Sequence, residues 1–223
     1  MVILYGHIVS VLRLIRWPNL LIVAATQILT RQCILAPLLR GANMDIQVPP
    51  FIFFLLVIST VFIAAGGYAI NDYFDRKIDM INKPDSMVVG THIYPRHAMA
   101  WHLIFTITGV ILGAFVAIRL GLAYLSLIFF MVSGLLWFYS TTYKSELLLG
   151  NIIVALLTAL VPFIVLVFEI PLLAKEYGSP FREISKYLIF WITGFSLFAF
   201  LLNLTREIVK DAQDFEGDQA YGK

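Results

Sequence analysis

The sequence Phe51-Ile-Phe-Phe-Leu-Leu-Val-Ile-Ser-Thr-Val-Phe-Ile-Ala-Ala-Gly-Gly-Tyr-Ala-Ile70 carries no charged side chain. A helix needs about 20 apolar residues to cross the hydrocarbon core of a bilayer, so this stretch predicts a membrane span. Four further runs lack charge, and one more is interrupted only by Arg31. These runs are Trp101–Ile118, Leu120–Tyr143, Leu147–Phe168, Tyr187–Thr205 and, with Arg31, Trp17–Leu39. The sequence therefore predicts an all-α, polytopic transmembrane helical bundle with six spans.

The composition of the chain agrees with a protein surrounded by lipid. Apolar residues make up 60% of the sequence and charged residues only 13%, whereas soluble domains carry about 25% charged residues. The formal net charge of +2 gives no indication of nucleic-acid binding. Cys33 is the only cysteine, so an intrachain disulfide is excluded. The four histidines show no metal-ligand spacing, and the sequence gives no oligomeric state.

The distribution of basic residues predicts how the chain lies in the membrane. If the N-terminus and alternate loops are placed on one side, that side holds ten Lys and Arg residues and the other side holds five. By the positive-inside rule, the richer side is cytoplasmic. We therefore expect a multi-pass protein of a bacterial or archaeal inner (plasma) membrane, with a cytoplasmic N-terminus. Arg31, inside a span, should face the bundle interior or a water-filled cavity, and a structural partner is the favoured interpretation.

Two aspartate motifs end the second and sixth spans on this cytoplasmic side. The first contains Asp72, Asp75 and Asp79, and the second contains Asp211, Asp214 and Asp218. Both have the spacing i, i+3 and i+7, which on an α-helix places the three side chains within about 60° of one another. A single motif of this kind could be a solvated helix end. Two motifs with the same spacing on one side predict a shared site.

The chemistry of these clusters favours a hard cation. Six carboxylates repel one another unless cations intervene, and oxygen donors without nearby His or Cys suit Mg²⁺. Mg²⁺ binds one or two carboxylates and completes its shell with water and substrate phosphate. We therefore expect all six aspartates to act as metal ligands in a diphosphate site, with Asp72, Asp75, Asp211 and Asp214 as catalytic residues. The amide oxygen of Asn71 is a further candidate ligand.

Basic and aromatic residues beside the motifs are candidates for substrate binding. Arg76, Arg206 and Lys210 could neutralise phosphate oxygens or could pair with the neighbouring carboxylates. Lys144, after Tyr139 at the end of the fourth span, is a candidate diphosphate contact or an ordinary snorkelling lysine. Asn151 either makes a structural hydrogen bond between spans or belongs to the site. The rings of Tyr73 and Phe74 could stabilise an allylic cation.

The motifs together resemble those of the UbiA superfamily of intramembrane prenyltransferases. The resemblance rests on Asn71-Asp-x-x-Asp75-x-x-x-Asp79 and Asp211-x-x-Asp214-x-x-x-Asp218. It also rests on Leu12-Arg-Leu-Ile-Arg16-Trp-Pro18 and on Tyr139…Lys144 followed by Leu149-Gly-Asn151. The stretch Arg206-Glu-Ile-Val-Lys210-Asp-x-x-Asp-x-x-Gly217-Asp218 is most similar to the branch that geranylgeranylates glycerol phosphate lipids.

The resemblance implies an enzyme that transfers a prenyl group from an allylic isoprenyl diphosphate to an acceptor in the membrane. Mg²⁺ would neutralise the leaving diphosphate. Lys144, as a further catalytic residue, would hold its oxygens together with Arg206 and Lys210, and Asn71, Arg76 and Tyr139 would complete the substrate site. Geranylgeranylglyceryl phosphate is the favoured acceptor, and a quinone or haem-type aromatic acceptor is the alternative. The family fold has nine helices. Residues 1–223 are therefore expected to form a single transmembrane domain that lacks its C-terminal helices, with less prenyl transfer than a longer chain.

Two further classes of protein compete with this interpretation. A CDP-alcohol phosphotransferase also uses clustered aspartates, but its Asp-Gly and Ala-Arg pairs are absent from both motifs. A non-enzymatic membrane protein with an acidic cation-binding vestibule would need polar residues that continue through the spans, and these are sparse. An inactive fragment of a prenyltransferase remains an open alternative.

Overall fold

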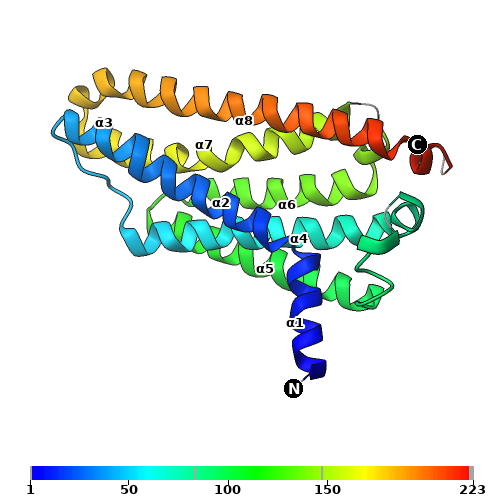
Figure 1. The fold of residues 1–223 in the computed structure, drawn as a ribbon. Helices are drawn as coiled ribbons and strands as arrows, with labels where there is room; N and C mark the ends of the chain where they lie inside the picture. The colour runs from blue at the N-terminus through cyan, green and yellow to red at the C-terminus, as the bar shows by residue number, and fades with distance from the viewer. Residues whose placement is uncertain (1, 83, 147, 221–223) are drawn as a thin grey trace.

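A computed structural model describes residues 2–82, 84–146 and 148–220, apart from the side chains of 2–6, 82, 86, 145 and 214–220. The fold in the described part is a bundle of long, roughly antiparallel helices (Figure 1). In chain order the elements are α1 Val2–Leu14, α2 Trp17–Leu29, η1 Thr30–Leu35, α3 Ala36–Gly41, α4 Pro50–Asn82, η2 Pro84–Ser86, α5 Pro95–Arg119, η3 Ala123–Leu125, α6 Ser126–Thr141, η4 Tyr143–Ser145, α7 Leu149–Tyr177 and α8 Ser179–Ala220.

Six helical segments are long and apolar enough to span a membrane, which confirms the predicted fold class. Their bounds differ from the charge-free runs. The helices α4 and α8 continue without a break through the two aspartate motifs. The fourth span begins only near Ala123, because the chain turns at Gly121, where φ is +72°. The motifs therefore lie on rigid helical extensions of the spans.

The first span contains an irregular turn around Arg31. Thr30–Leu35 form a π-helical turn between α2 and α3, just before Pro37, which has no N–H to donate to the preceding turn. Arg31 is buried, as predicted for an arginine inside a span. Its Nη2 donates to the Val48 carbonyl at 2.6 Å, and its guanidinium lies 4.3 Å from the centre of the Phe53 ring. This is the structural role that the sequence favoured.

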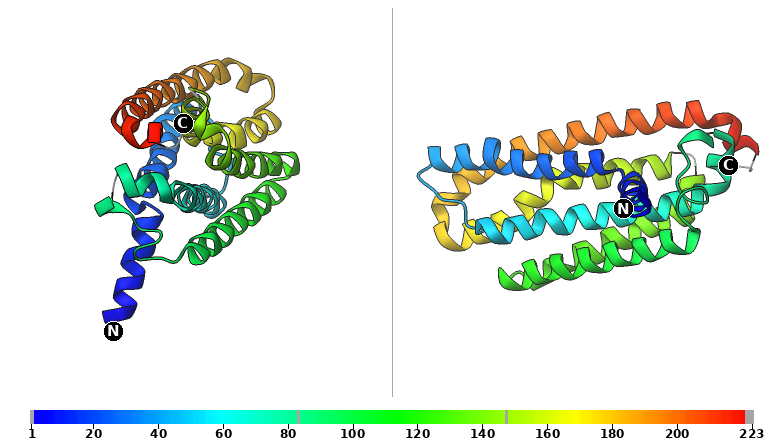
Figure 2. Two further views of the ribbon diagram at one scale, coloured as in Figure 1. Left: turned by 90° about the vertical axis from the view of Figure 1, so that its right-hand side faces the viewer. Right: turned by 60° about the horizontal axis from the view of Figure 1, so that its bottom comes forward.

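The two ends of the bundle differ in character. We call the end that carries the aspartate motifs the motif end, and the other the distal end. The large apolar core occupies the distal half, where Phe53, Phe129 and Phe168 pack together with Leu173 and Leu188. Among the described residues, the motif end has a small apolar cluster around Leu14 and Val89. Figure 2 shows α1 projecting away from the bundle at the motif end. The polar site is therefore built where apolar packing is sparse.

The close contact between α4 and α5 depends on glycine. A Cβ on Gly109 would lie 2.9 Å from the Ser59 carbonyl oxygen and 3.0 Å from the Ile63 amide nitrogen, both of them backbone atoms. Gly109→Ala should therefore force the two helices apart and lower the free energy of unfolding by about 1–3 kcal/mol. Unfolding in mild detergent would measure the loss. Gly194→Ala in α8 is the control, because its Cβ meets no atom within 4 Å, and an equal loss there would contradict the prediction.

Candidate functional site

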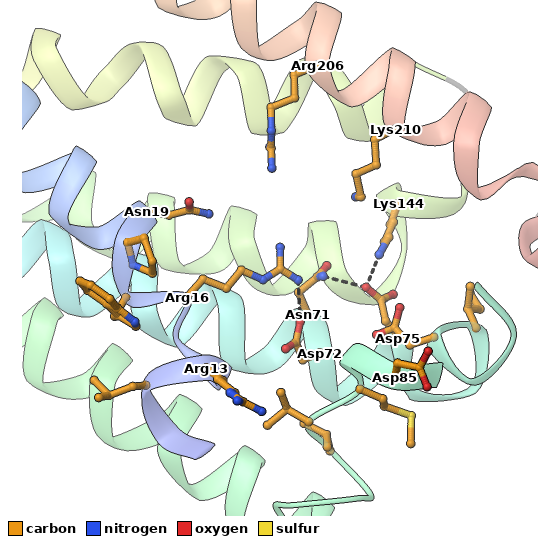
Figure 3. Close-up of a pocket in the computed structure, with 18 of the residues that line it drawn as sticks. Arg13, Arg16, Asn19, Asn71, Asp72, Asp75, Asp85, Lys144, Arg206 and Lys210 are labelled. Atoms are coloured by element: carbon orange, nitrogen blue, oxygen red, sulfur yellow. Dashed lines mark hydrogen bonds and ion pairs between the residues drawn. The ribbon is translucent and has the colours of Figure 1, made fainter. Parts of the chain in front are cut away.

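A cavity of about 770 Å³ opens at the motif end between α4 and α8. Its walls come from the α1–α2 junction, α4, the segment after α4, η4 and α8, as Figure 3 shows. Its polar lining residues are Arg13, Arg16, Asn19, Asn71, Asp72, Asp75, Asp79, Asp85, Lys144, Arg206, Lys210 and Asp211. The lining thus combines acidic and basic side chains from segments far apart in the sequence.

The α4 wall presents the first aspartate motif on one helical face. The Asp72 Oδ1 accepts a hydrogen bond from the Arg16 Nη2 at 2.7 Å. Arg16 sits in the left-handed region, with φ of 50°, where the chain turns from α1 into α2. The Arg16 guanidinium also lies 5.1 Å from the centre of the Tyr68 ring. Burial lowers the pKa of Arg16, but the neighbouring acidic groups, with Asp72 first among them, together hold it above its ordinary value.

The Asp75 carboxylate is the most enclosed acid of this wall, with 4% of the residue exposed. Its Oδ2 accepts from the Asn71 Nδ2 at 2.7 Å and also from the Lys144 Nζ. Lys144 belongs to η4, the short turn between α6 and α7, so the ion pair ties that connection to α4. The Asn71 Oδ1 is buried without a hydrogen-bond partner among the described residues. One acceptor therefore remains unused beside Asp75.

The α8 wall carries cations and one described aspartate of the second motif. The Asp211 Oδ2 accepts from the Asn151 Nδ2 of α7 at 2.7 Å. The buried Glu207 pairs with the Arg206 Nη1 at 2.8 Å and with the Lys210 Nζ at 3.4 Å. Figure 3 shows Arg206 and Lys210 extending from α8 toward the α4 wall. The Asp214 and Asp218 side chains lie outside the described residues.

The structure brings most of the predicted site residues together. Those that line the cavity are Asn71, Asp72, Asp75, Asp79, Lys144, Arg206, Lys210 and Asp211. Arg76 and Tyr139 are not among the described lining residues. The Arg76 guanidinium lies 5.9 Å from the centre of the Tyr73 ring, and Tyr139 is buried against Gly150. Tyr73 and Phe74 pack edge to face and also lie off the described lining.

Four polar lining residues were not predicted as site residues: Arg13, Arg16, Asn19 and Asp85. A signal for the first two was present. Arg13 and Arg16 are three residues apart, immediately before the first span, and on the same side of the membrane as both motifs. They were counted as charges that set topology and as part of the motif that carries the resemblance, but not as site residues. Asn151, for which the sequence left two interpretations open, positions Asp211 through its hydrogen bond.

The donor set fits a magnesium ion. Among the described residues, no three Asp, Glu, His or Cys side chains form a ready metal cage. Mg²⁺ does not require one, because it takes only one or two carboxylates and obtains its other oxygen ligands from water and phosphate. Asp72, Asp75 and Asp211 supply carboxylates, and the unpartnered Asn71 Oδ1 supplies a neutral oxygen. All of these are hard oxygen donors.

Comparison with known proteins places the chain among membrane prenyltransferases. The sequence pattern of the UbiA prenyltransferase family matches residues 35–223. The digeranylgeranylglyceryl phosphate synthase of Methanosphaera stadtmanae is 35% identical over 160 residues, which cover 71% of this chain and 51% of that protein. The synthase of Methanopyrus kandleri is 34% identical over 189 residues, which cover 85% of this chain and 60% of that one.

A solved structure shares the fold. It is described as "Structural and mechanistic insights into the biosynthesis of Digeranylgeranylglyceryl phosphate synthase in membranes". Its chain is 27% identical to this one, with a TM-score of 0.65, and the similarity covers 97% of this chain and 66% of that chain. The chain spans about half the length of the first curated relatives it matches.

Proposed function

This chain belongs to the UbiA prenyltransferase family, and on that premise we propose that it transfers a prenyl group from an allylic isoprenyl diphosphate to an acceptor within the membrane. The observation that supports the proposal most strongly is the cavity at the motif end. There Asp72, Asp75 and Asp211 lie together with Lys144, Arg206 and Lys210. Alternating acids and bases of this kind suit a metal ion bound together with a diphosphate.

The residues of the cavity would have separate roles in ionising the diphosphate. Asp72, Asp75 and Asp211, with the Asn71 Oδ1, would hold Mg²⁺, which when bound supplies positive charge against the leaving diphosphate. Asp79, Asp214 and Asp218 are proposed as supporting ligands. Lys144, Arg206 and Lys210 would hold diphosphate oxygens through charge-assisted hydrogen bonds. The allylic C1–O bond would break as the diphosphate leaves, and a nucleophilic atom of the acceptor would bond to C1 and lose its proton.

The favoured acceptor is geranylgeranylglyceryl phosphate, because the curated relatives that match the chain are digeranylgeranylglyceryl phosphate synthases. An aromatic acceptor of the quinone or haem type is the second candidate. A cation vestibule is less compatible with the fold, because the polar cavity at the motif end gives way to an apolar core in the distal half. We also propose that the N-terminus and the cavity face the cytoplasm.

A binding assay and a transfer assay test the proposal separately. The purified chain is incubated with labelled geranylgeranyl diphosphate in Mg²⁺ or in EDTA, and bound label is counted. The same mixtures then receive geranylgeranylglyceryl phosphate or a hydroxybenzoate, and labelled lipid is separated by chromatography. We expect Mg²⁺-dependent binding and a product with the glycerol lipid. Equal binding in EDTA would refute the metal site, and a product only with the aromatic compound would reverse the choice of acceptor.

A further inference from the structure

The two aspartates best placed to bind a metal are already paired with cations of the chain itself. The Arg16 Nη2, 56 residues away in the sequence, donates a hydrogen bond to the Asp72 Oδ1 at 2.7 Å. The Lys144 Nζ, 69 residues away in the sequence, donates to the Asp75 Oδ2, which also accepts a hydrogen bond from Asn71. Each ion pair occupies one oxygen of its carboxylate and neutralises the negative charge that would attract a metal ion, so the cation competes with the metal.

The partners in each pair differ in how firmly they are held. The Asp72 and Asp75 side chains are 14% and 6% exposed, and both project from the regular helix α4. The Arg16 and Lys144 side chains are 39% and 22% exposed, and both come from short connections between helices. The aspartates are thus fixed, whereas the cations are long, flexible side chains at the rim of the cavity.

We propose that Arg16 and Lys144 are exchangeable counter-ions. In the empty site they neutralise Asp72 and Asp75, and when the metal arrives with a diphosphate they leave the carboxylates and bind the phosphate oxygens. The inference rests on the proposed function and adds a residue to it, because Arg16 was assigned no part in the site. It makes the two ligands interdependent, since the metal alone must displace two ion pairs and the diphosphate gives the displaced cations a new partner.

Metal binding in the absence of diphosphate separates this proposal from a purely structural role for the pairs. Mn²⁺ serves as the probe, and the signal of free Mn²⁺ in electron paramagnetic resonance reports how much is bound. Arg16→Gln and Lys144→Gln should each bind Mn²⁺ about fivefold more tightly than the unaltered chain, because the competing cation is gone. The same variants should bind labelled geranylgeranyl diphosphate about tenfold more weakly in saturating Mg²⁺.

Lys77→Gln is the matched control. Lys77 lies in the first motif on α4 but is exposed and off the described lining of the cavity, so its loss removes the same charge without freeing an aspartate. Its Mn²⁺ affinity should stay within about twofold of the unaltered chain, since exposed charges interact weakly. If Lys77→Gln gained as much Mn²⁺ affinity as the other two variants, net charge alone would explain the effect and the proposal would be overturned. Unchanged or weaker Mn²⁺ binding in folded Arg16→Gln and Lys144→Gln would overturn it too.

A measurement on the unaltered chain keeps the test independent of how the variants fold. A thiolodiphosphate analogue of geranylgeranyl diphosphate, which resists ionisation, is added to saturation. The Mn²⁺ affinity, corrected for chelation in solution, should rise about tenfold, and by linkage Mn²⁺ should strengthen binding of the analogue by the same factor. Independent binding of the two ligands would refute the exchange. Failure of the analogue to bind at all would instead refute the proposed function.

Discussion

Asp75→Asn is expected to lower the affinity for an allylic diphosphate in Mg²⁺ by about a hundredfold, the largest effect on binding among the cavity residues. Asp75 is the most buried acid of the α4 wall, and its Oδ2 accepts hydrogen bonds from both Asn71 and Lys144. The change removes the negative charge that would hold the metal. Asp72→Asn, closer to the rim, should cost at least about tenfold.

Calorimetry with geranylgeranyl diphosphate, in Mg²⁺ and in EDTA, would measure both losses. In EDTA the two variants and the unaltered chain should bind equally poorly, because the lost interaction acts through the metal. Asp45→Asn is the control, since Asp45 is exposed at the distal end, where its backbone amide donates to the Tyr177 hydroxyl. If Asp75→Asn kept full affinity in Mg²⁺ while remaining folded, the assignment of the first motif as a metal site would be wrong.

The features of this fold that depend on local periodicity could be predicted from the sequence. Membrane spans follow from long apolar runs, and the shared face of Asp72, Asp75 and Asp79 follows from helical geometry alone. The same geometry leaves Arg76 beside this face, because it follows Asp72 by four positions and lies about 40° from it around the helix. What periodicity does not give is the direction of its long side chain, whose guanidinium lies beside the Tyr73 ring.

The features that depend on irregular backbone could not be predicted in this way. Arg16 reaches Asp72 only because the chain turns through a positive φ between α1 and α2, which no apolar pattern encodes. Lys144 reaches Asp75 from the short turn η4, beyond the end of its span. The π-helical turn around Arg31 is a third case. In each, an irregular backbone segment brings a charged side chain to a partner far away in the sequence, and a single sequence does not reveal which partner that is.

The second large effect is expected at the distal end, where Arg31→Met should lower the free energy of unfolding by about 3–5 kcal/mol. The backbone of the α3–α4 connection lies between two buried charges. The Val48 carbonyl accepts from the Arg31 Nη2 at 2.6 Å, while the Val48 amide donates to the Glu169 carboxylate at 3.3 Å. Glu169, 1% exposed in α7, also accepts from the Gln47 amide. Removing Arg31 leaves the Val48 carbonyl without its donor and takes away a positive charge that interacts with the buried Glu169.

The double variant Arg31→Met, Glu169→Gln tests this reason. It removes both charges, while the side-chain amide oxygen introduced at position 169 can still accept from the Val48 amide. The loss in free energy of unfolding for the double variant should be smaller than the sum of the two single-variant losses by at least about 1 kcal/mol, because the two charges interact. Unfolding by a graded anionic detergent in mild micelles would measure all three variants. Arg119→Gln is the matched control, because Arg119 is exposed at the distal end and should change stability by less than about 0.5 kcal/mol. Strictly additive losses would show that Arg31 and Glu169 stabilise the bundle independently of each other.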